Sequence, residues 1–184
     1  GVPGVVRARL ATAQGAGAPE GYPMTNRGMR VLVTGAGSGI GLGIAQHLAA
    51  RAHEVWLTDR DAPAVEQAAA ELRDRGLAAS ALVLDVTAAA DIDAVVAALE
   101  PAGIDLLVNN AGLQHVAPLE EFPRERWELL VAVMLTGAAM LTRALLPGMR
   151  GRGFGRIVNI GSIHSLVASP YKSAYVAAKH GLIG

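Results

Sequence analysis

Cysteine is absent from this chain of 184 residues, which excludes disulfide scaffolds and metal sites built on thiolates. The five histidines include no HExxH motif and no other pair at metal-ligand spacing, so we expect no metal site. The formal net charge is zero and the arginines are scattered, a pattern that offers nucleic acid no basic surface. No apolar run has the length of a bilayer span, so we expect neither a transmembrane segment nor a membrane partner.

The composition that remains is that of a globular protein, with 52% hydrophobic and 17% charged residues. Residues 1–28 stand apart because they are rich in Gly, Ala and Pro and contain no acid before Glu20. They also lack the continuous apolar stretch of a signal peptide. We therefore predict a disordered or extraneous segment at residues 1–28 and one domain at residues 29–184.

From Arg30 onward, short apolar bursts alternate with amphipathic stretches. We predict strands at residues 30–34, 54–58, 80–84, 105–108 and 156–160. The first three helices are marked by apolar side chains at helical spacing, and Thr87 is the predicted cap of the third. These side chains are Ile40, Ile44 and Leu48 in the first helix, Val65, Ala69 and Leu72 in the second, and Ile92, Val95, Val96 and Leu99 in the third.

A longer helix is predicted to open at Pro123 and to be broken by the glycine-rich residues 148–155. Its apolar face comprises Trp127, Leu130, Val131, Met134, Ala138, Leu141 and Leu145. A last helix begins near Lys172. Strict alternation of strands and helices with short connections predicts an α/β fold with a doubly wound parallel sheet, the Rossmann architecture.

Four glycines occupy the turn between the first strand and the first helix, at Gly35, Gly37, Gly39 and Gly41. Glycine lets the backbone approach a pyrophosphate closely, and the helix N-terminus behind it offers free N–H groups and the positive end of a dipole. A lone glycine-rich loop could be no more than a flexible turn. This one follows a strand, opens a helix and is followed by an acid after the second strand, which favours a dinucleotide site.

That acid is Asp59. In dinucleotide-binding folds, an acid about 20 residues after the glycine loop accepts hydrogen bonds from the adenosine ribose hydroxyls. A carboxylate would also repel a 2′-phosphate, so we expect NAD rather than NADP, with Arg60 and Arg51 weakening that preference. The alternative is that Asp59 is an ordinary surface turn residue.

Further motifs follow in an order that resembles the short-chain dehydrogenase/reductase family. The glycine loop has the spacing T-G-x-x-x-G-x-G, Asp85-Val86 follows the third strand, and N-N-A-G follows the fourth at residues 109–112. Ser162 lies thirteen residues before Tyr175, and Lys179 completes a Y-x-x-x-K motif. The resemblance implies three catalytic residues, Ser162, Tyr175 and Lys179. It implies NAD contacts at Gly35, Ser38, Gly39, Ile40, Gly41, Asp59, Asp85, Val86, Asn110, Ala111, Gly112, Tyr175 and Lys179.

The chemistry of the Tyr/Lys pair can also be argued from the residues. Tyr175 and Lys179 are four residues apart on one predicted helix and so share a face. A phenol is a poor base at neutral pH, and an adjacent ammonium stabilises the phenolate. The chain holds fourteen arginines but only two lysines, Lys172 and Lys179, so the compact ammonium is confined to this short stretch.

Within the family, three stretches resemble the D-3-hydroxybutyrate dehydrogenases: N-N-A-G-L-Q-H-V-A-P-L-E-E-F-P, L-P-G-M-R, and the run from Ser162 to Gly181. The likeness implies a small carboxylate substrate, bound by Gln114, Ser162, His164, Lys172 and Tyr175. An amide, an imidazole and an ammonium suit a short carboxylate. The alternatives are solvated loop residues for Gln114 and Lys172 and a structural histidine for His164. His115 and His180 receive no role.

Two departures from the family pattern bear on activity. The family usually has an Asn seven residues after the position of Trp127, and here that residue is Met134, whose thioether is only a weak acceptor. The family also continues for about a third of its length beyond Gly184, so we expect an incomplete domain without the last two strands. Slower catalysis is expected from Met134, and an open substrate pocket from the missing part.

The leading hypothesis is a cytoplasmic, NAD-dependent oxidoreductase that interconverts D-3-hydroxybutyrate and acetoacetate. One alternative is a reductase of another small keto substrate, such as a 3-oxoacyl thioester. The other is a catalytically impaired nucleotide-binding fragment. The family resemblance implies a homo-oligomer, a dimer or tetramer, paired through the apolar faces of residues 125–146 and 174–183.

Overall fold

The computed structural model describes residues 28–100 and 102–184, and the expectation for residues 1–27 lies outside them. Five parallel strands form one sheet in the order β3-β2-β1-β4-β5. Their bounds are β1 Arg30–Thr34, β2 Glu54–Asp59, β3 Ala79–Val83, β4 Leu106–Asn109 and β5 Arg156–Asn159. The predicted doubly wound sheet is confirmed, with strand ends within one residue of the predicted ones.

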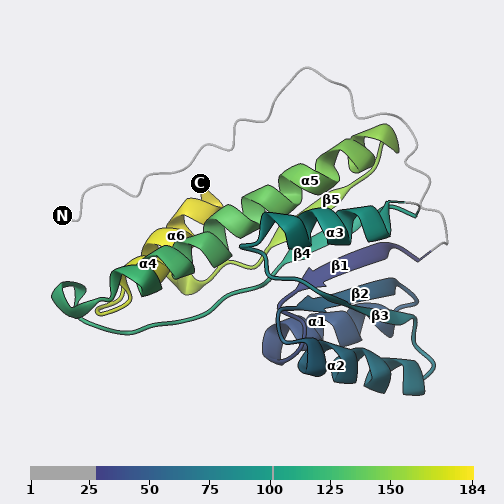
Figure 1. The fold of residues 1–184 in the computed structure, drawn as a ribbon, viewed down its shortest axis with the longest axis horizontal. Helices are drawn as coiled ribbons and strands as arrows, with labels where there is room; N and C mark the ends of the chain where they lie inside the picture. The colour runs from purple at the N-terminus through teal and green to yellow at the C-terminus, as the bar shows by residue number, and fades with distance from the viewer. Residues whose placement is uncertain (1–27, 101) are drawn as a thin grey trace, which may run out of the picture.

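Helices cover both faces of this sheet (Figure 1). The first two, α1 (Gly39–Ala49) and α2 (Ala62–Asp74), pack on one face against alternate side chains of β1, among them Val31 and Val33. On the other face, α3 (Ala89–Leu99) and α5 (Ala138–Gly151) pack around Leu32 of the same strand and Leu107 of β4. Successive side chains of a strand point to opposite faces, so β1 is buried on both sides.

The remaining helical segments surround the carboxyl ends of β4 and β5. They are η1 (Leu119–Glu121), α4 (Arg124–Val131), the π-helical turn η2 (Ala132–Gly137), η3 (Ile163–Ser165) and α6 (Ser173–Ile183). Leu130 and Met134 pack against Ala174 and Ala178 of α6, in a third apolar cluster. Because α4, η2 and α5 are continuous, the π turn lies inside one long helix beside α6 (Figure 1).

Two local predictions were wrong. On α1, Ile44 and Leu48 pack against the core as predicted, beside Gly41, Ala45 and Ala49, but the predicted Ile40 is exposed. Thr87 does not cap α3, because its hydroxyl donates to the Asp85 carboxylate and Ala88 takes the N-cap position. The long helix runs through Pro147 and ends at Gly151, inside the predicted break at residues 148–155.

The expectation that no segment reaches bilayer length also needs correction. The helix Arg124–Gly151 has 28 residues and contains an 18-residue stretch with a mean hydropathy of 2.0, enough to cross a membrane by length and composition alone. Only 28% of that stretch is buried within the chain. The length of this apolar helix is not apparent from the sequence, because Thr and Gly interrupt its apolar residues without adding charge. The helix therefore has apolar surface beyond the face that packs on the fold.

The amino-terminal edge of the sheet is held by an ion pair that the sequence did not reveal. The Arg30 guanidinium lies 3.0 Å from the Asp105 carboxylate, and the Arg30 backbone N–H donates to the same side chain. Burial alone would raise the pKa of Asp105, but the bonds from Arg30 outweigh it and hold the pKa below its ordinary value. This pair joins the starts of β1 and β4, so it lies away from the carboxyl ends of the strands.

Candidate active site and cofactor pocket

The turn from β1 into α1 has a backbone that only glycine adopts without strain. Gly35 and Gly39 have φ values of 63° and 56°, in the left-handed region. A Cβ on Gly41 would lie 2.1 Å from the Gly35 carbonyl oxygen. At the helix start, the Ser38 side chain makes no cap bond and the first turn contains no acid. The first N–H groups of α1 and the positive end of its dipole are therefore available to bind an anion such as a pyrophosphate.

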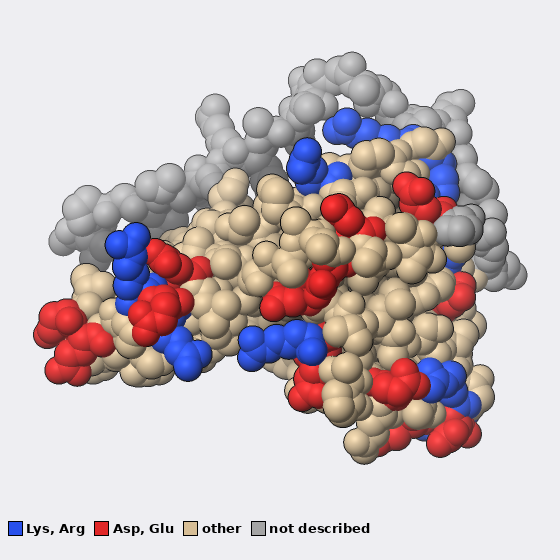
Figure 2. Space-filling model, in the orientation of Figure 1, with Lys and Arg blue, Asp and Glu red and all other residues tan. Residues whose placement is uncertain are grey.

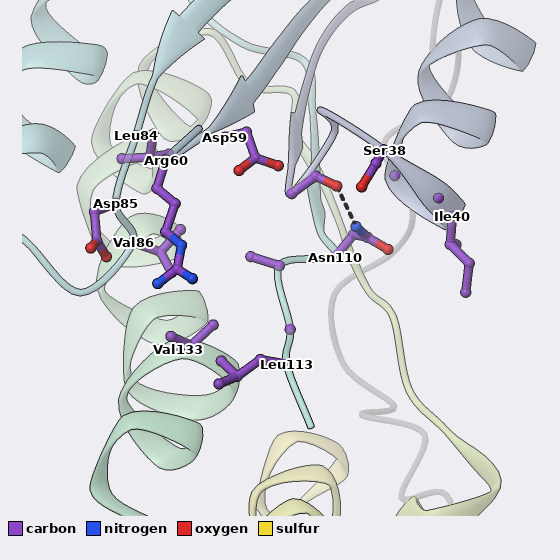
Figure 3. A pocket seen from close by; sticks show the side chains of 15 residues that line it. Ser38, Ile40, Asp59, Arg60, Leu84, Asp85, Val86, Asn110, Leu113 and Val133 are labelled. Carbon is purple, nitrogen blue, oxygen red and sulfur yellow. Dashed lines mark hydrogen bonds between the residues drawn. The ribbon is translucent and has the colours of Figure 1, made fainter. Parts of the chain in front are cut away.

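Hydrogen bonds between Thr34, Gly35 and the N-N-A-G loop hold this turn in place. The Thr34 hydroxyl accepts hydrogen bonds from the backbone N–H groups of Asn110 and Ala111, each at 3.0 Å. The Asn110 amide donates back to the carbonyl oxygens of Thr34 at 2.9 Å and Gly35 at 3.1 Å, the latter drawn as a dashed line in Figure 3. The N-N-A-G motif thus fixes the glycine turn from the carboxyl end of β4.

A cavity of about 350 Å³ opens at the carboxyl ends of the strands. It lies where the strand order reverses on either side of β1, the place at which open α/β sheets bind ligands. Of the cofactor contacts that the sequence predicted, the cavity brings together Gly35, Ser38, Gly39, Ile40, Gly41, Asp59, Asp85, Val86, Asn110, Ala111 and Gly112. Tyr175 and Lys179 do not line it and lie on α6.

The lining also includes residues for which the sequence predicted no cofactor contact. These are Arg60, Leu84, Leu113 and Val133. Arg60 points into the cavity between Asp59 and Asp85, as Figure 3 shows. Its position directly after the acid of β2 is the sequence feature that indicates this place in the cavity. Val133 gave no such signal because it belonged to the apolar run of the long helix.

Two carboxylates border this cavity in different ways. Asp59 accepts the backbone N–H of Gly37 at 3.1 Å and that of Asp61 at 3.1 Å, so it stabilises the glycine turn. A carboxylate has about four acceptor positions, which leaves capacity for ribose hydroxyls. Hydrogen bonds from Thr87 lower the pKa of Asp85 against the opposing effect of burial, and the charge of Arg60 adds to the lowering.

The predicted catalytic residues come from β5, η3 and α6, which follow one another in the chain. Ser162 caps η3, and its Oγ accepts the backbone N–H of His164 at 3.1 Å. The Ser165 hydroxyl in turn accepts the N–H of Ser162 at 3.1 Å, which completes a capping box and fixes the serine. The ring of Tyr175 meets that of His164 edge-on, with 6.1 Å between the ring centres, so η3 and α6 lie against each other.

Lys179 is buried beneath Tyr175, with 5% of its surface exposed. Its Nζ donates to the Ile160 carbonyl oxygen at 2.6 Å and lies 5.9 Å from the centre of the Tyr175 ring. Burial lowers the pKa of Lys179, because removal from water disfavours the ammonium. The ammonium lies over the Tyr175 ring, and it gives up its proton more readily than an exposed lysine does.

A second cavity, of about 10 Å³, lies between Lys179 and Met134. Thr34 and Ala111 also line it, and Ala111 borders the larger cavity as well. A space of this size is about that of one water molecule. Met134 is 2% exposed and offers a thioether where an amide would supply both a donor and an acceptor. The chain's departure from the family's Asn therefore lies beside the lysine that is predicted to be catalytic.

The predicted substrate residues gather on two loops that touch. The backbone N–H of Ala117 donates to the Tyr171 carbonyl oxygen at 3.0 Å, which joins the Gln114 loop to the loop before α6. The Gln114 amide oxygen accepts the N–H of His115 at 3.1 Å, so its NH₂ end is the one suited to a carboxylate. Lys172 lies 3.5 Å from the ring of His164. An amide and an ammonium thus flank the segment that bears Ser162 and Tyr175.

Replacing Gly41 with Ala should weaken NAD binding at least about tenfold, the effect of roughly 1.4 kcal/mol. The added methyl would clash with the Gly35 carbonyl and with the Asn110 amide, so the turn must open. Gly43→Ala is the matched control, because a Cβ there meets nothing within 4 Å and should stabilise α1 by about 1 kcal/mol. Calorimetric NAD titration and urea unfolding of both variants test this. Equal NAD affinity for Gly41→Ala and the unmodified chain would contradict the assigned turn.

A family model described as short chain dehydrogenase matches residues 29–184. The chain belongs to the short-chain dehydrogenase family. It is 48% identical over 162 residues to the D-beta-hydroxybutyrate dehydrogenase of Cupriavidus necator, covering 85% of this chain and 62% of that protein. It is 44% identical to the gluconate 5-dehydrogenase of Gluconobacter oxydans, covering 83% of this chain and 60% of that protein.

A solved structure agrees with this membership. The gluconate 5-dehydrogenase of Burkholderia cenocepacia, in complex with NADP and tartrate, matches with a TM-score of 0.80 and 38% identity. The match covers 85% of this short-chain dehydrogenase and 62% of that chain. The chain therefore spans about 60% of the length of the relatives it matches. The family binds NAD or NADP, and the glycine turn, Asp59 and the N-N-A-G loop border the cavity at the carboxyl ends of the strands.

Proposed function

We propose that this short-chain dehydrogenase uses NAD to interconvert D-3-hydroxybutyrate and acetoacetate. The observation that carries the proposal is a single constellation at the carboxyl edge of the sheet. An uncapped helix N-terminus and Asp59 border one cavity, and Ser162, Tyr175 and Lys179 follow on the adjoining segments. The 48% identity to a D-beta-hydroxybutyrate dehydrogenase supports the substrate class.

In this proposal, Tyr175 takes the proton of the substrate hydroxyl as its carbon–oxygen bond becomes a carbonyl. Bound NAD supplies the acceptor for the hydride that leaves the same carbon. The Ser162 oxygen already accepts from the His164 N–H, so its own proton is free to donate to the substrate oxygen. Lys179 stabilises the phenolate from below, and the reverse reaction returns the proton from Tyr175.

The carboxylate of the substrate would bind beyond this oxygen, at Gln114 and Lys172. A charge-assisted bond from an ammonium is among the stronger single contacts available to a carboxylate. Charges of both signs are mixed over the face that Figure 2 shows, and the formal net charge of the chain is zero. Selection of an acid therefore depends on a few placed groups rather than on a general positive field.

A second candidate is oxidation of a larger hydroxy acid with NADP. Two gluconate 5-dehydrogenases are among the relatives described above, and one of them is solved with NADP and tartrate. Arg60 favours this candidate, since its guanidinium points into the cavity beside Asp59 (Figure 3). Asp59 favours the first candidate, because a carboxylate bonded to the glycine turn repels a 2′-phosphate.

Cofactor choice is tested by Asp59→Ala. We expect the unmodified chain to bind NAD more tightly than NADP, and the variant to narrow that ratio about tenfold or more, the contribution of roughly one charge-assisted hydrogen-bond pair. Asp61→Ala is the control, because Asp61 caps α2 but does not line the cavity. Tighter NADP binding to the unmodified chain, measured by titration with each dinucleotide, would refute the assignment of Asp59.

Activity is to be measured in a completed chimera, in which residues 30–184 of this chain replace the matching part of the Cupriavidus necator D-beta-hydroxybutyrate dehydrogenase. In this chimera, Met134→Asn should raise turnover and leave NAD affinity nearly unchanged. The physical reason is that the amide adds a donor and an acceptor to the small cavity beside Lys179 without touching the dinucleotide cavity. Steady-state kinetics and NAD titration check both halves. If turnover is unchanged or falls, a relay through position 134 does not operate in this protein.

We also propose a homodimer or homotetramer paired through the long helix. The helix Arg124–Gly151 has apolar surface beyond its buried face, and Met140 is one of its exposed apolar side chains. Two copies of such a helix can cover each other across a two-fold axis, as symmetric oligomers do. In this proposal, the apolar surface that gives the helix the hydropathy of a membrane span is covered by a second copy of the chain.

A further inference from the structure

We infer that the turn at Tyr171 is a strained latch, which holds the loop before α6 against the Gln114 loop and opens at low cost. A carboxylate bound between Gln114 and Lys172 keeps this latch closed. The second statement rests on the proposed function. The first does not, since it follows from the backbone conformation and the hydrogen bonds of the chain.

The backbone of Tyr171 has a conformation that tyrosine adopts only with strain. Its φ is 62°, in the left-handed region, where a side chain comes too close to the carbonyl oxygen that follows it. Pro170 precedes it, and a turn with proline second and a positive φ third favours Gly or Asn at the third position. Tyr171 is 59% exposed, so burial of its ring offsets little of the strain. Contacts of the main chain must therefore hold the turn.

A hydrogen bond joins this turn to the other loop. The Tyr171 carbonyl oxygen accepts the backbone N–H of Ala117 at 3.0 Å. Ala117 lies three residues after Gln114, and Lys172 follows Tyr171 as the N-cap residue of α6. The strain at one residue and the net contribution of one hydrogen bond are similar in size, so the bond gives the closed turn little net stability. The latch can therefore open locally while the sheet stays folded.

The consequence concerns how the site closes on an acid. Gln114 is on one loop and Lys172 is on the other, so a carboxylate that binds both side chains links the two loops. Such a ligand binds the closed arrangement better than the open one and shifts the latch toward closure. A neutral molecule of the same shape lacks the charge that the Lys172 ammonium binds. The strain at Tyr171 thus makes closure depend on the charge of the bound molecule.

Amide hydrogen exchange of Ala117, followed by NMR, measures the latch in the 184-residue chain without any activity. Tyr171→Asn should slow this exchange about tenfold, because Asn tolerates the left-handed region. Tyr171→Phe keeps the strain and should exchange as the unmodified chain does. Ala52→Asn is the matched control: Ala52 also has a φ of 62°, but it lies in the turn after α1 and should not affect Ala117.

Three results would overturn the latch. They are an Ala117 amide without protection in the unmodified chain, an unchanged exchange rate in Tyr171→Asn, and equal slowing in Ala52→Asn. The first would mean that the turn is not closed in solution. The second would mean that strain at Tyr171 does not control opening, and the third that Ala117 responds only to the stability of the whole chain.

The link to a carboxylate is tested separately in the completed chimera with NADH bound. Butyrate, which has a carboxylate but no hydroxyl to oxidise, should slow Ala117 exchange about tenfold, and the neutral butyramide should not. If butyrate gives no protection, or butyramide gives as much, the carboxylate role of Gln114 and Lys172 in the proposed function fails, while slowed exchange in Tyr171→Asn still supports the latch. Protection by butyrate with unchanged exchange in Tyr171→Asn would support the substrate class and overturn the strained latch.

Discussion

Tyr175→Phe should lower kcat for oxidation of D-3-hydroxybutyrate in the completed chimera by about 10²- to 10⁴-fold, the usual contribution of a general base. The phenol is the group that takes the substrate proton in the proposed mechanism, and phenylalanine retains the ring that packs against His164. NAD affinity should change little, because Tyr175 does not line the dinucleotide cavity. Stopped-flow NADH formation with excess NAD measures the chemical step.

Tyr171→Phe is the matched control for this experiment. Tyr171 is exposed and lies four residues earlier, and its described role is through its backbone carbonyl, which accepts from Ala117. Its phenol should be dispensable. If Tyr175→Phe keeps more than about a tenth of the activity, or if both variants lose it equally, another group is the base.

Lys172→Ala in the completed chimera should impair 3-hydroxybutyrate oxidation about 10- to 150-fold, mainly in KM. Removing a charge-assisted contact costs about 1.5–3 kcal/mol, which corresponds to that range. The effect falls on KM if the carboxylate contact is equal in the ground state and the transition state. Oxidation of 2-butanol, a neutral alcohol of similar size, should be spared, since it has no carboxylate for the ammonium to bind.

The comparison of the two substrates is the control built into this experiment. Both use Ser162 and Tyr175 for the hydroxyl, so a loss of fold would lower both rates. Equal losses for the acid and the alcohol would mean that Lys172 supports the loop before α6 and not the substrate. The choice of 3-hydroxybutyrate would then rest on similarity to relatives alone.

Sequence reasoning located the strands well because a doubly covered sheet leaves a strong pattern. The side chains from Val31 to Thr34 of the central strand β1 are buried, so Val31, Leu32 and Val33 form an unbroken apolar run. The cofactor turn was equally visible, because Gly35, Gly39 and Gly41 are each required by backbone geometry or by close approach. Both patterns are formed by residues close together in the sequence, so they can be recognised without a structure.

The errors arose where contacts between elements decide the outcome. Helix α1 packs through Gly41, Ala45 and Ala49 because small side chains let it approach the sheet, and hydropathy gave the larger Ile40 too much weight. The Thr87 hydroxyl could either accept from an N–H group at the start of α3 or donate to a nearby carboxylate, and in the structure it donates to Asp85.

The measurement that tests the central claim most directly is the initial rate of reduced dinucleotide formation by the completed chimera, with D-3-hydroxybutyrate or gluconate and with NAD or NADP. The account predicts that D-3-hydroxybutyrate with NAD gives the highest kcat/KM, at least about tenfold above each of the other three combinations, because Asp59 and Lys172 each contribute roughly one charge-assisted contact. A higher kcat/KM for gluconate with NADP would contradict it.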